Sequence, residues 1–258
     1  KTQDNDFHYL LDEFADLKVI RFRVPGWDNL SLRQKEYAYH LSEAAKLGRD
    51  ITWDQYCKWN LPIRHVVEDI LNEYEGDSEC ADFQNFTVYA KRLFFANGIH
   101  HHYSEDKFFP ECPKEYFQSL MEAVGDGEQA TELLEVIYSP DIYPQRRSTS
   151  KTGDIVELSA VNFYDGVTRE EVDKYYNSMM DPNDKTPISY GLNTKVVKED
   201  GKVVEKPWKV GGIYGPALEK ICAELEKAAA VAETDLQKEA IGKLVEYYRT
   251  GDLKTWDD

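Results

Sequence analysis

The sequence lacks every short motif that marks a self-contained catalytic or metal site. None of its six histidines is followed by glutamate, so the paired-histidine helix of a zinc peptidase is missing from these 258 residues. It has no Gly-x-Ser-x-Gly nucleophile motif, no Walker loop and no Gly-x-Gly-x-x-Gly fingerprint. The four cysteines form no Cys-x-x-Cys pair, which argues against a zinc finger or a thioredoxin-like redox site. We therefore expect no catalytic residue and no metal ligand set within this chain.

Long apolar runs are also missing. No stretch approaches the roughly 20 apolar residues that a membrane-spanning helix needs, and no secretory signal peptide is visible. The chain begins at Lys1 rather than methionine, so we infer that something upstream was removed. We expect a soluble protein without a membrane span, either cytoplasmic or, if a leader was removed before Lys1, periplasmic.

Basic residues are scarce relative to acidic ones. The 31 lysines and arginines face 48 aspartates and glutamates, which gives a net charge of −17. A chain of this charge repels phosphate backbones and anionic lipid, so we expect nucleic acid and membrane surfaces to be poor partners. The acidity is typical of a soluble surface, and it also attracts cationic groups such as the amino terminus of a peptide.

What the sequence does contain is enough apolar residue to form a core, arranged mostly at helical spacing. Hydrophobic residues make up 41% and aromatic residues 13% of the chain, which argues against disorder. Ser31 with Gln34, and Thr168 with Glu171, have the spacing of capping boxes, while Asp82 is expected to cap a third helix. The expected helices cover residues 31–47, 62–75, 82–96, 113–124, 128–138, a segment beginning at 168, 216–230 and 234–249.

Two segments are expected to be strands. Asp200-Gly201 separates two runs rich in β-branched residues, which predicts a hairpin over residues 193–206 with Glu199 opposite Lys202. Residues 155–163 have the composition of a further strand. The predicted fold class is therefore α+β: predominantly helical, with a helical part at about 1–150 and a mixed part with a small antiparallel sheet or barrel at about 151–258.

One polar cluster, at residues 97–104, allows three interpretations. His100 and His102 would face one way in an extended loop and could hold a metal, although spacing marks no third ligand. The imidazoles and Tyr103 could instead line a substrate cleft. The segment could also be a polar surface turn.

Several segments together resemble the bacterial branch of the dipeptidyl peptidase III family of zinc metallopeptidases. They occur in unbroken order over nearly the whole chain, although no single one is a catalytic signature. The segments are residues 14–17, 24–27, 30–36, 95–103 with 107–108, 162–168, 181–182, 189–193, 208–212 and 248–254.

This resemblance implies a two-lobed enzyme that releases dipeptides from the N-termini of short peptides. It implies that zinc in the intact enzyme sits on a His-Glu-x-x-Gly-His-type helix, which lies beyond Asp258. The chain would then be an N-terminal fragment, over 1–258, comprising most of the non-zinc lobe. We expect it to bind peptides, to bind no zinc, to be inactive alone and to need the missing C-terminal zinc lobe as its partner.

By the same resemblance, the substrate-binding residues are His102, Tyr103 and Ser104, with Asn97 shaping the loop. The family often has phenylalanine followed by glycine where this sequence has Tyr103-Ser104. The alternative from composition is a non-catalytic acidic helical binding or interaction module.

Overall fold

A computed structural model describes residues 7–258, and Lys1 lies outside this range. The chain folds as two units that interleave in sequence, with unit 1 formed by Lys1–Asn29 and Trp59–Ile142 and unit 2 by Leu30–Lys58 and Tyr143–Asp258. This division follows packing, whereas the expected division at about residue 150 followed secondary-structure type. Helices predominate and the sheets are small, so the predicted α+β class is confirmed.

Unit 1 is a small helical domain with one hairpin. Strands β1 (Leu10–Phe14) and β2 (Leu17–Ile20) pair antiparallel, and a short 3₁₀ turn, η1 (Trp27–Asn29), follows. The helices are α3 (Asn60–Glu73), α4 (Ala81–Ala96), α5 (Lys114–Ala123), the 3₁₀ turn η2 (Gly127–Gln129) and α6 (Ala130–Tyr138).

Aromatic rings form the centre of unit 1. Phe86 and Tyr89 on α4 meet Phe117 on α5 with ring centroids 5.0 and 6.1 Å apart, in edge-to-face arrangements. The Tyr89 ring also meets Phe108, 5.6 Å away. All four rings are buried, so α4, α5 and the segment between them share one core.

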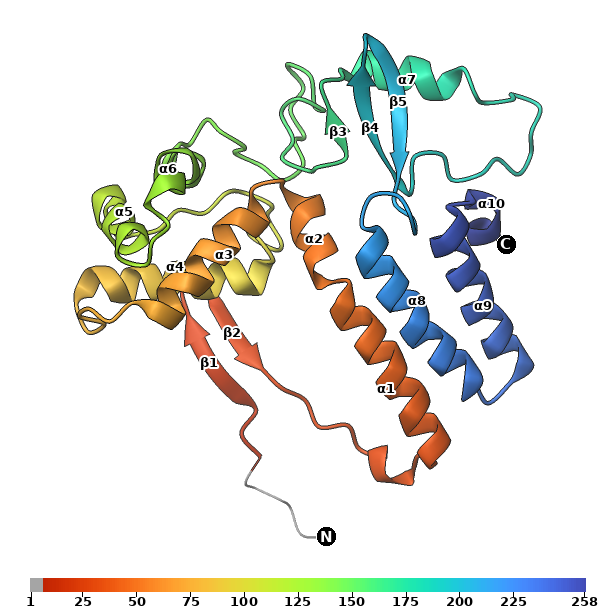
Figure 1. Cartoon of the computed structure of the whole chain (residues 1–258), viewed down its shortest axis with the longest axis horizontal. Helices are drawn as coiled ribbons and strands as arrows, with labels where there is room; N and C mark the ends of the chain where they lie inside the picture. The colour runs from red at the N-terminus through yellow and green to blue at the C-terminus, as the bar shows by residue number, and fades with distance from the viewer. Residues whose placement is uncertain (1–6) are drawn as a thin grey trace. The chain divides into compact units, whose positions relative to one another are not determined.

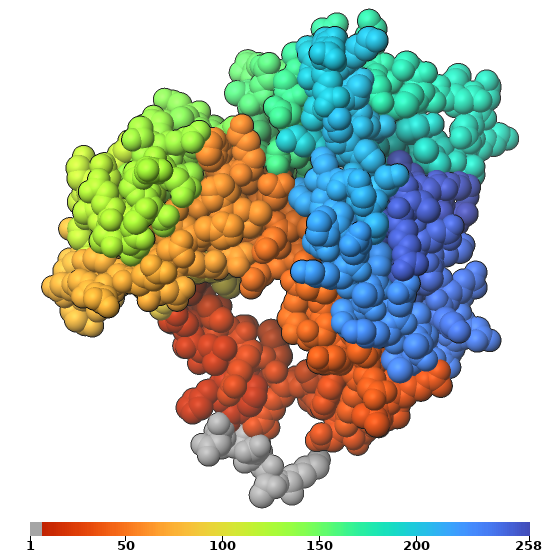
Figure 2. Space-filling view, in the orientation of Figure 1, coloured from red at the N-terminus to blue at the C-terminus, as the bar shows by residue number. Residues whose placement is uncertain are grey.

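Unit 2 contains a three-helix layer and a three-stranded sheet. Helices α1 (Leu32–Leu47), α8 (Gly215–Ala230) and α9 (Asp235–Thr250) pack side by side in that spatial order, as Figure 1 shows. In the space-filling view of Figure 2 the atoms of α8 and α9 adjoin on the face that is shown. The core cluster of this layer consists of Ala44, Leu218, Ile221, Cys222, Leu225, Ile241 and Val245.

The sheet of unit 2 has the order β3-β4-β5. Strand β3 (Tyr164–Asp165) runs parallel to β4 (Thr194–Glu199), which pairs antiparallel with β5 (Lys202–Pro207). Helix α7 (Arg169–Asn177) covers it through Val172, which shares a second small core with Val167 and Val196. The unit also contains α2 (Arg49–Tyr56) and α10 (Leu253–Asp257).

Most of the predicted local structure is confirmed. The Ser31 and Thr168 capping boxes form as expected, and Glu199 lies opposite Lys202 in the hairpin. The prediction of a strand over 155–163 was wrong, because Asp154 accepts the backbone N–H of Val156 and holds the segment in turns. Asp82 is not the cap of α4; Cys80 occupies that position.

Candidate functional site

The segment that the sequence singled out forms a closed loop in unit 1, residues 97–108, called here the 97–108 loop. Backbone bridging between His100 and Lys107 brings its two ends together. The His101 N–H donates to the Asp106 carbonyl at 2.8 Å, and the Glu105 N–H donates to the His101 carbonyl at 3.0 Å. The chain thus reverses direction within this loop, whereas the metal-site interpretation required an extended segment.

Asn97 ends helix α4 and starts the loop. It adopts the left-handed conformation (φ 56°) that asparagine tolerates, and its N–H donates to the carbonyls of Leu93 and Phe94. The buried side chain of Asn60, on α3, donates to the Asn97 carbonyl at 3.4 Å. The same side chain accepts the N–H of Ile99 at 3.2 Å, so α3 and α4 both fix the beginning of the loop.

His101 organises the tip of the loop. Its Nδ1 accepts the backbone N–H groups of Tyr103, at 3.2 Å, and Ser104, at 3.1 Å. These two bonds assign the lone pair to Nδ1 and place the ring proton on Nε2. The Nε2 atom lies 3.2 Å from a carboxylate oxygen of Asp16, in the turn between β1 and β2.

Lys107 anchors the far end of the loop. Its buried ammonium group donates to three backbone carbonyls at the end of α6, those of Val136, Ser139 at 2.6 Å, and Ile142 at 2.8 Å. Three charge-assisted hydrogen bonds compensate the burial of a lysine, and a cation favours a helix C-terminus.

With both ends fixed, the loop presents His102 and Tyr103 outward from unit 1. Tyr103 is 87% exposed. The exposed His102 ring lies edge-on to Phe95 at 5.1 Å, and Phe95 in turn meets Phe14 of β1 at 6.4 Å. The three rings form an aromatic row beside Tyr103, a surface suited to apolar and stacking contacts.

Of the four predicted site residues, Ser104 alone lines a cavity found in unit 1. This cavity of about 300 Å³ is also lined by Asp16, Arg92 and His101. The hydroxyl oxygen of Ser104 accepts the Asp106 N–H at 3.3 Å. Asn97, His102 and Tyr103 do not line it.

The histidine pair does not form a metal site as the extended-loop interpretation required. His100 is buried, whereas His102 is exposed, because the loop turns between them. Over residues 7–258, no group of three or more His, Cys, Asp and Glu side chains is placed to hold a metal ion.

Sequence reasoning missed the residues that hold the loop in place. Asn60 and Asp16 come from segments far from the loop in sequence. Asp16 falls in a segment that carries the family resemblance (14–17), but nothing in the local pattern of either residue indicates a contact with the loop. Lys107 looks like a surface lysine, although the structure buries it. Three-dimensional contacts alone reveal these roles.

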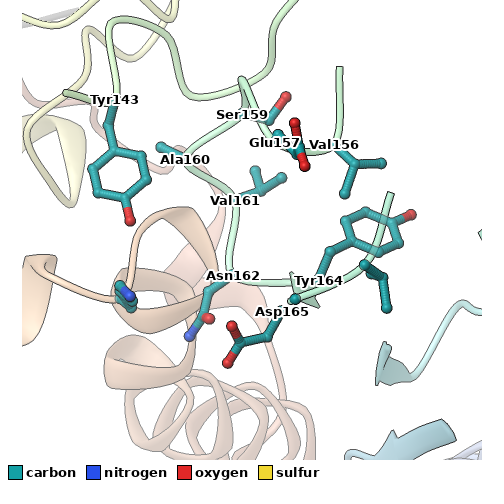
Figure 3. A pocket seen from close by; sticks show the side chains of 12 residues that line it. Tyr143, Val156, Glu157, Ser159, Ala160, Val161, Asn162, Tyr164 and Asp165 are labelled. Carbon is teal, nitrogen blue, oxygen red and sulfur yellow. The ribbon is translucent and has the colours of Figure 1, made fainter. Parts of the chain in front are cut away.

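A polar pocket of about 320 Å³ lies in unit 2 and is lined mainly by the segment 156–167 (Figure 3). At its base, the side chains of Asn162 and Asp165 lie near each other, and the Lys195 ammonium is 2.7 Å from Asn162 Oδ1 and 3.7 Å from Asp165. Asn162 also donates to Asp54 at 3.1 Å, and the Tyr214 hydroxyl donates to the same Asp54 oxygen at 2.5 Å.

Several polar groups at this pocket are already engaged in hydrogen bonds. Burial, followed by the hydrogen bond to Asp54 and its charge, raises the pKa of Tyr214 well above its usual range. The Ser159 hydroxyl donates to the Ile155 carbonyl and accepts the Ser148 N–H, and no histidine or cysteine lines the pocket. The network therefore joins α2 and α8 to the segment before β3, and it contains no nucleophile–base pair.

The helices of residues 7–258 include none that is long and apolar enough to cross a membrane.

Comparison with known proteins gives one consistent relationship. No model of a protein family matches the chain. The chain is 24% identical over 267 residues to human (Homo sapiens) dipeptidyl peptidase 3, a match that covers 87% of this chain and 36% of that protein.

Two solved structures are similar in fold. Dipeptidyl peptidase III from Caldithrix abyssi gives a TM-score of 0.53 at 18% identity, covering 88% of this chain and 32% of that one. The enzyme from Corallococcus sp. strain EGB gives 0.54 at 17% identity, covering 90% and 33%. The chain thus spans about a third of the length of these relatives. The resemblance to dipeptidyl peptidase III predicted from the sequence is confirmed.

Proposed function

We propose that this chain is the N-terminal, peptide-binding part of a dipeptidyl peptidase that releases dipeptides from the amino terminus of short peptides. The observation that carries the proposal is the sequence similarity to human dipeptidyl peptidase 3 over 87% of the chain. The fold similarity to two bacterial enzymes of the same name supports it independently.

In this proposal the 97–108 loop contacts the first residues of the peptide. Tyr103 offers an apolar ring with a polar hydroxyl, and His102 extends the aromatic row of Phe14 and Phe95. Asn97 and Ser104 shape the loop through the hydrogen bonds that they make with backbone groups. A loop fixed at both ends contacts a peptide with little loss of conformational entropy, which favours binding.

Charge supports the same assignment. A peptide that is recognised by its free amine carries an ammonium group, and the chain has a net charge of −17. The field of the protein therefore attracts the end of the substrate at which a dipeptide is removed.

We propose that the zinc of the intact enzyme is held by residues outside this chain. The described residues do not fit a zinc site, since no cluster of three His, Cys, Asp or Glu side chains occurs over 7–258. The contribution of this chain is then to bind and orient the peptide against the C-terminal zinc lobe, its proposed partner.

The experiment is to assay the chain alone and within its complete open reading frame on a dipeptidyl-arylamide. We expect hydrolysis by the complete protein and none by residues 1–258 with added zinc. Hydrolysis by the isolated chain would overturn the division of roles. An open reading frame that encodes no zinc-peptidase helix downstream would instead favour a non-catalytic binding module.

The loop assignment is tested in the complete enzyme by Tyr103→Ala. Loss of the aromatic contact between the Tyr103 ring and the bound peptide should lower kcat/KM about tenfold. The matched control is Tyr39→Ala, which removes an exposed tyrosine from α1, in unit 2, and should leave kcat/KM unchanged. Equal effects of the two variants would contradict the assignment.

A further inference from the structure

A second cavity in unit 2 has the features of a cation-binding pocket. It lies between the β4–β5 hairpin, α7 and the segment 178–193, which in Figure 1 leaves α7, swings out beside β5 and returns to β4. Its volume is about 630 Å³. The residues that matter for the argument are Tyr175, Met179, Tyr190, Thr194, Glu205 and Leu253.

The polar centre of this pocket is the half-buried carboxylate of Glu205, on β5. One of its oxygens accepts the Tyr176 hydroxyl and the Thr194 hydroxyl, each at 2.8 Å. Burial raises the pKa of Tyr175, and the charge of Glu205 and a hydrogen bond to it raise it further. Hydroxyl donors thus hold the carboxylate in place and aim it at the cavity.

Glu205 has no counter-ion in the part of the chain that the structure describes. Within residues 7–258, no lysine, arginine or histidine nitrogen lies within 4 Å of its carboxylate. The adjacent residue in sequence, Lys206, pairs instead with Glu199 at 2.7 Å. Partial burial weakens the hydration of a carboxylate, and hydroxyl donors leave its charge unneutralised. A cationic ligand would supply the missing charge.

The walls around Glu205 are apolar and aromatic. The rings of Tyr175 and Tyr190 and the side chains of Met179 and Leu253 line the same cavity. Aromatic faces and thioether groups stabilise alkylammonium ions while accommodating an apolar stem. The Glu205 carboxylate and the apolar walls together favour a cation at the end of an aliphatic chain over an inorganic ion.

Hydrogen bonds restrain the 178–193 segment, which forms one wall of the pocket. The Tyr190 hydroxyl donates to the Met179 carbonyl at 3.2 Å, which closes the 178–193 segment on itself. Ser189 donates through its backbone N–H and hydroxyl to Asp257, at 2.9 and 2.7 Å, which ties the segment to α10. A site that needs little ordering on binding retains more of the interaction energy.

We propose that this pocket binds a primary ammonium group carried on a short aliphatic stem, with Glu205 as the counter-ion. The ammonium can come from a lysine side chain or from a peptide amino terminus. The proposal does not depend on the peptidase function, since the site lies in unit 2 and the 97–108 loop in unit 1.

The experiment uses the chain 1–258 labelled with ¹³C at its methionine methyl groups. The three methionines are natural probes, because Met179 lines the pocket, its neighbour Met180 is exposed and does not line it, and Met121 is fully buried in unit 1. Titration with Nα-acetyl-lysine amide, and separately with Ala-Ala, should move the Met179 signal saturably while Met121 stays fixed. Comparing the two ligands identifies the source of the ammonium group.

Two comparisons test the role of charge. Glu205→Gln keeps the shape and the hydroxyl contacts but removes the charge, and it should weaken binding at least about tenfold. Glu199→Gln makes the same change in net charge at an exposed site on the same hairpin, and it should weaken binding less than about twofold.

The ligand-side control needs no variant. Nα-acetyl-norleucine amide has the apolar stem without the ammonium group, and it should fail to shift Met179 at the same concentrations. Equal binding of norleucine and lysine amides would overturn the proposal, as would the absence of saturable shifts with both amines. Equal weakening by the two glutamine variants would also overturn it.

Discussion

A Cβ atom at Gly98 would lie 2.2 Å from the side-chain amide nitrogen of Asn60. Real Cβ contacts are never this short, so the absence of a side chain at residue 98 is what lets α3 approach the start of the 97–108 loop. The Gly98 backbone also has a φ of +147°, which glycine alone adopts without strain. One glycine thus satisfies both a steric and a conformational requirement of the loop.

Gly98→Ala is therefore expected to destabilise unit 1 by about 3 kcal/mol, measured by urea denaturation. The matched control is Gly125→Ala, at φ +92° with nothing within 4 Å of its Cβ, which should cost about 1 kcal/mol from backbone strain alone. Equal losses in the two variants would mean that Asn60 moves aside without cost.

Lys107→Met should reduce the free energy of unfolding by about 3 kcal/mol. The substitution keeps the aliphatic stem but leaves three carbonyls at the end of α6 without their donor. Lys114→Met removes an exposed lysine paired with Glu135 and should cost less than about 0.5 kcal/mol. A loss at Lys107 no greater than at Lys114 would contradict the anchoring role of the ammonium group.

Tyr103→Ala should leave stability unchanged within about 0.5 kcal/mol, because its side chain is 87% exposed. Thermal unfolding of the chain 1–258 measures this directly. A large loss of stability would show that the ring belongs to a core rather than to a binding surface. The loss of kcat/KM expected in the complete enzyme would then have a structural cause.

Alkaline pH should destabilise unit 2. Burial, with the nearby Tyr248 and Asp257 as smaller causes, raises the pKa of Tyr247 to about 12 in the folded protein. The pKa of a tyrosine in the unfolded chain is about 10. Because the folded pKa is the higher one, this contribution to stability is complete below pH 10 and is lost as pH rises from 10 to 12. Its slope is about 1.4 kcal/mol per pH unit for this proton.

Urea midpoints measured between pH 8 and 12 test this expectation. Tyr247→Phe removes the titrating group, so the free energy of unfolding should fall less steeply with pH, by the slope that one proton contributes. This difference separates Tyr247 from other groups that ionise in the same range. Identical pH profiles for the variant and the natural chain would refute the assignment.

Local signals predicted most of the helices and the β4–β5 hairpin. The Ser31 and Thr168 capping boxes form because their hydrogen bonds lie within four residues, where sequence spacing is informative. Asp200 and Gly201 both adopt positive φ, as the two-residue turn required. Helix α2 was missed because it follows α1 directly, with Gly48 serving as the end of one and the start of the other.

The loop was predicted as a candidate site, but its shape was not. Its conformation depends on Asp16, Asn60 and the end of α6, none of which is near it in sequence. The prediction of a strand over 155–163 failed for a different, local reason, since the Asp154 side chain accepts the backbone N–H of Val156 in place of a strand partner. It also accepts the Arg169 N–H at 2.7 Å. The Glu205 pocket could not be predicted from sequence, because α7, β4, β5 and the segment 178–193 create it jointly.

The interleaving of the two units sets an order for folding during synthesis. Every segment of unit 1 has been made once the ribosome passes Ile142, so its aromatic core can close while most of unit 2 is still untranslated. Helix α1 is made early, yet its partner α8 begins only at Gly215. The apolar face of α1 is therefore uncovered until α8 (Gly215–Ala230) has been made, and slowing elongation before Gly215 should prolong its exposure to chaperones.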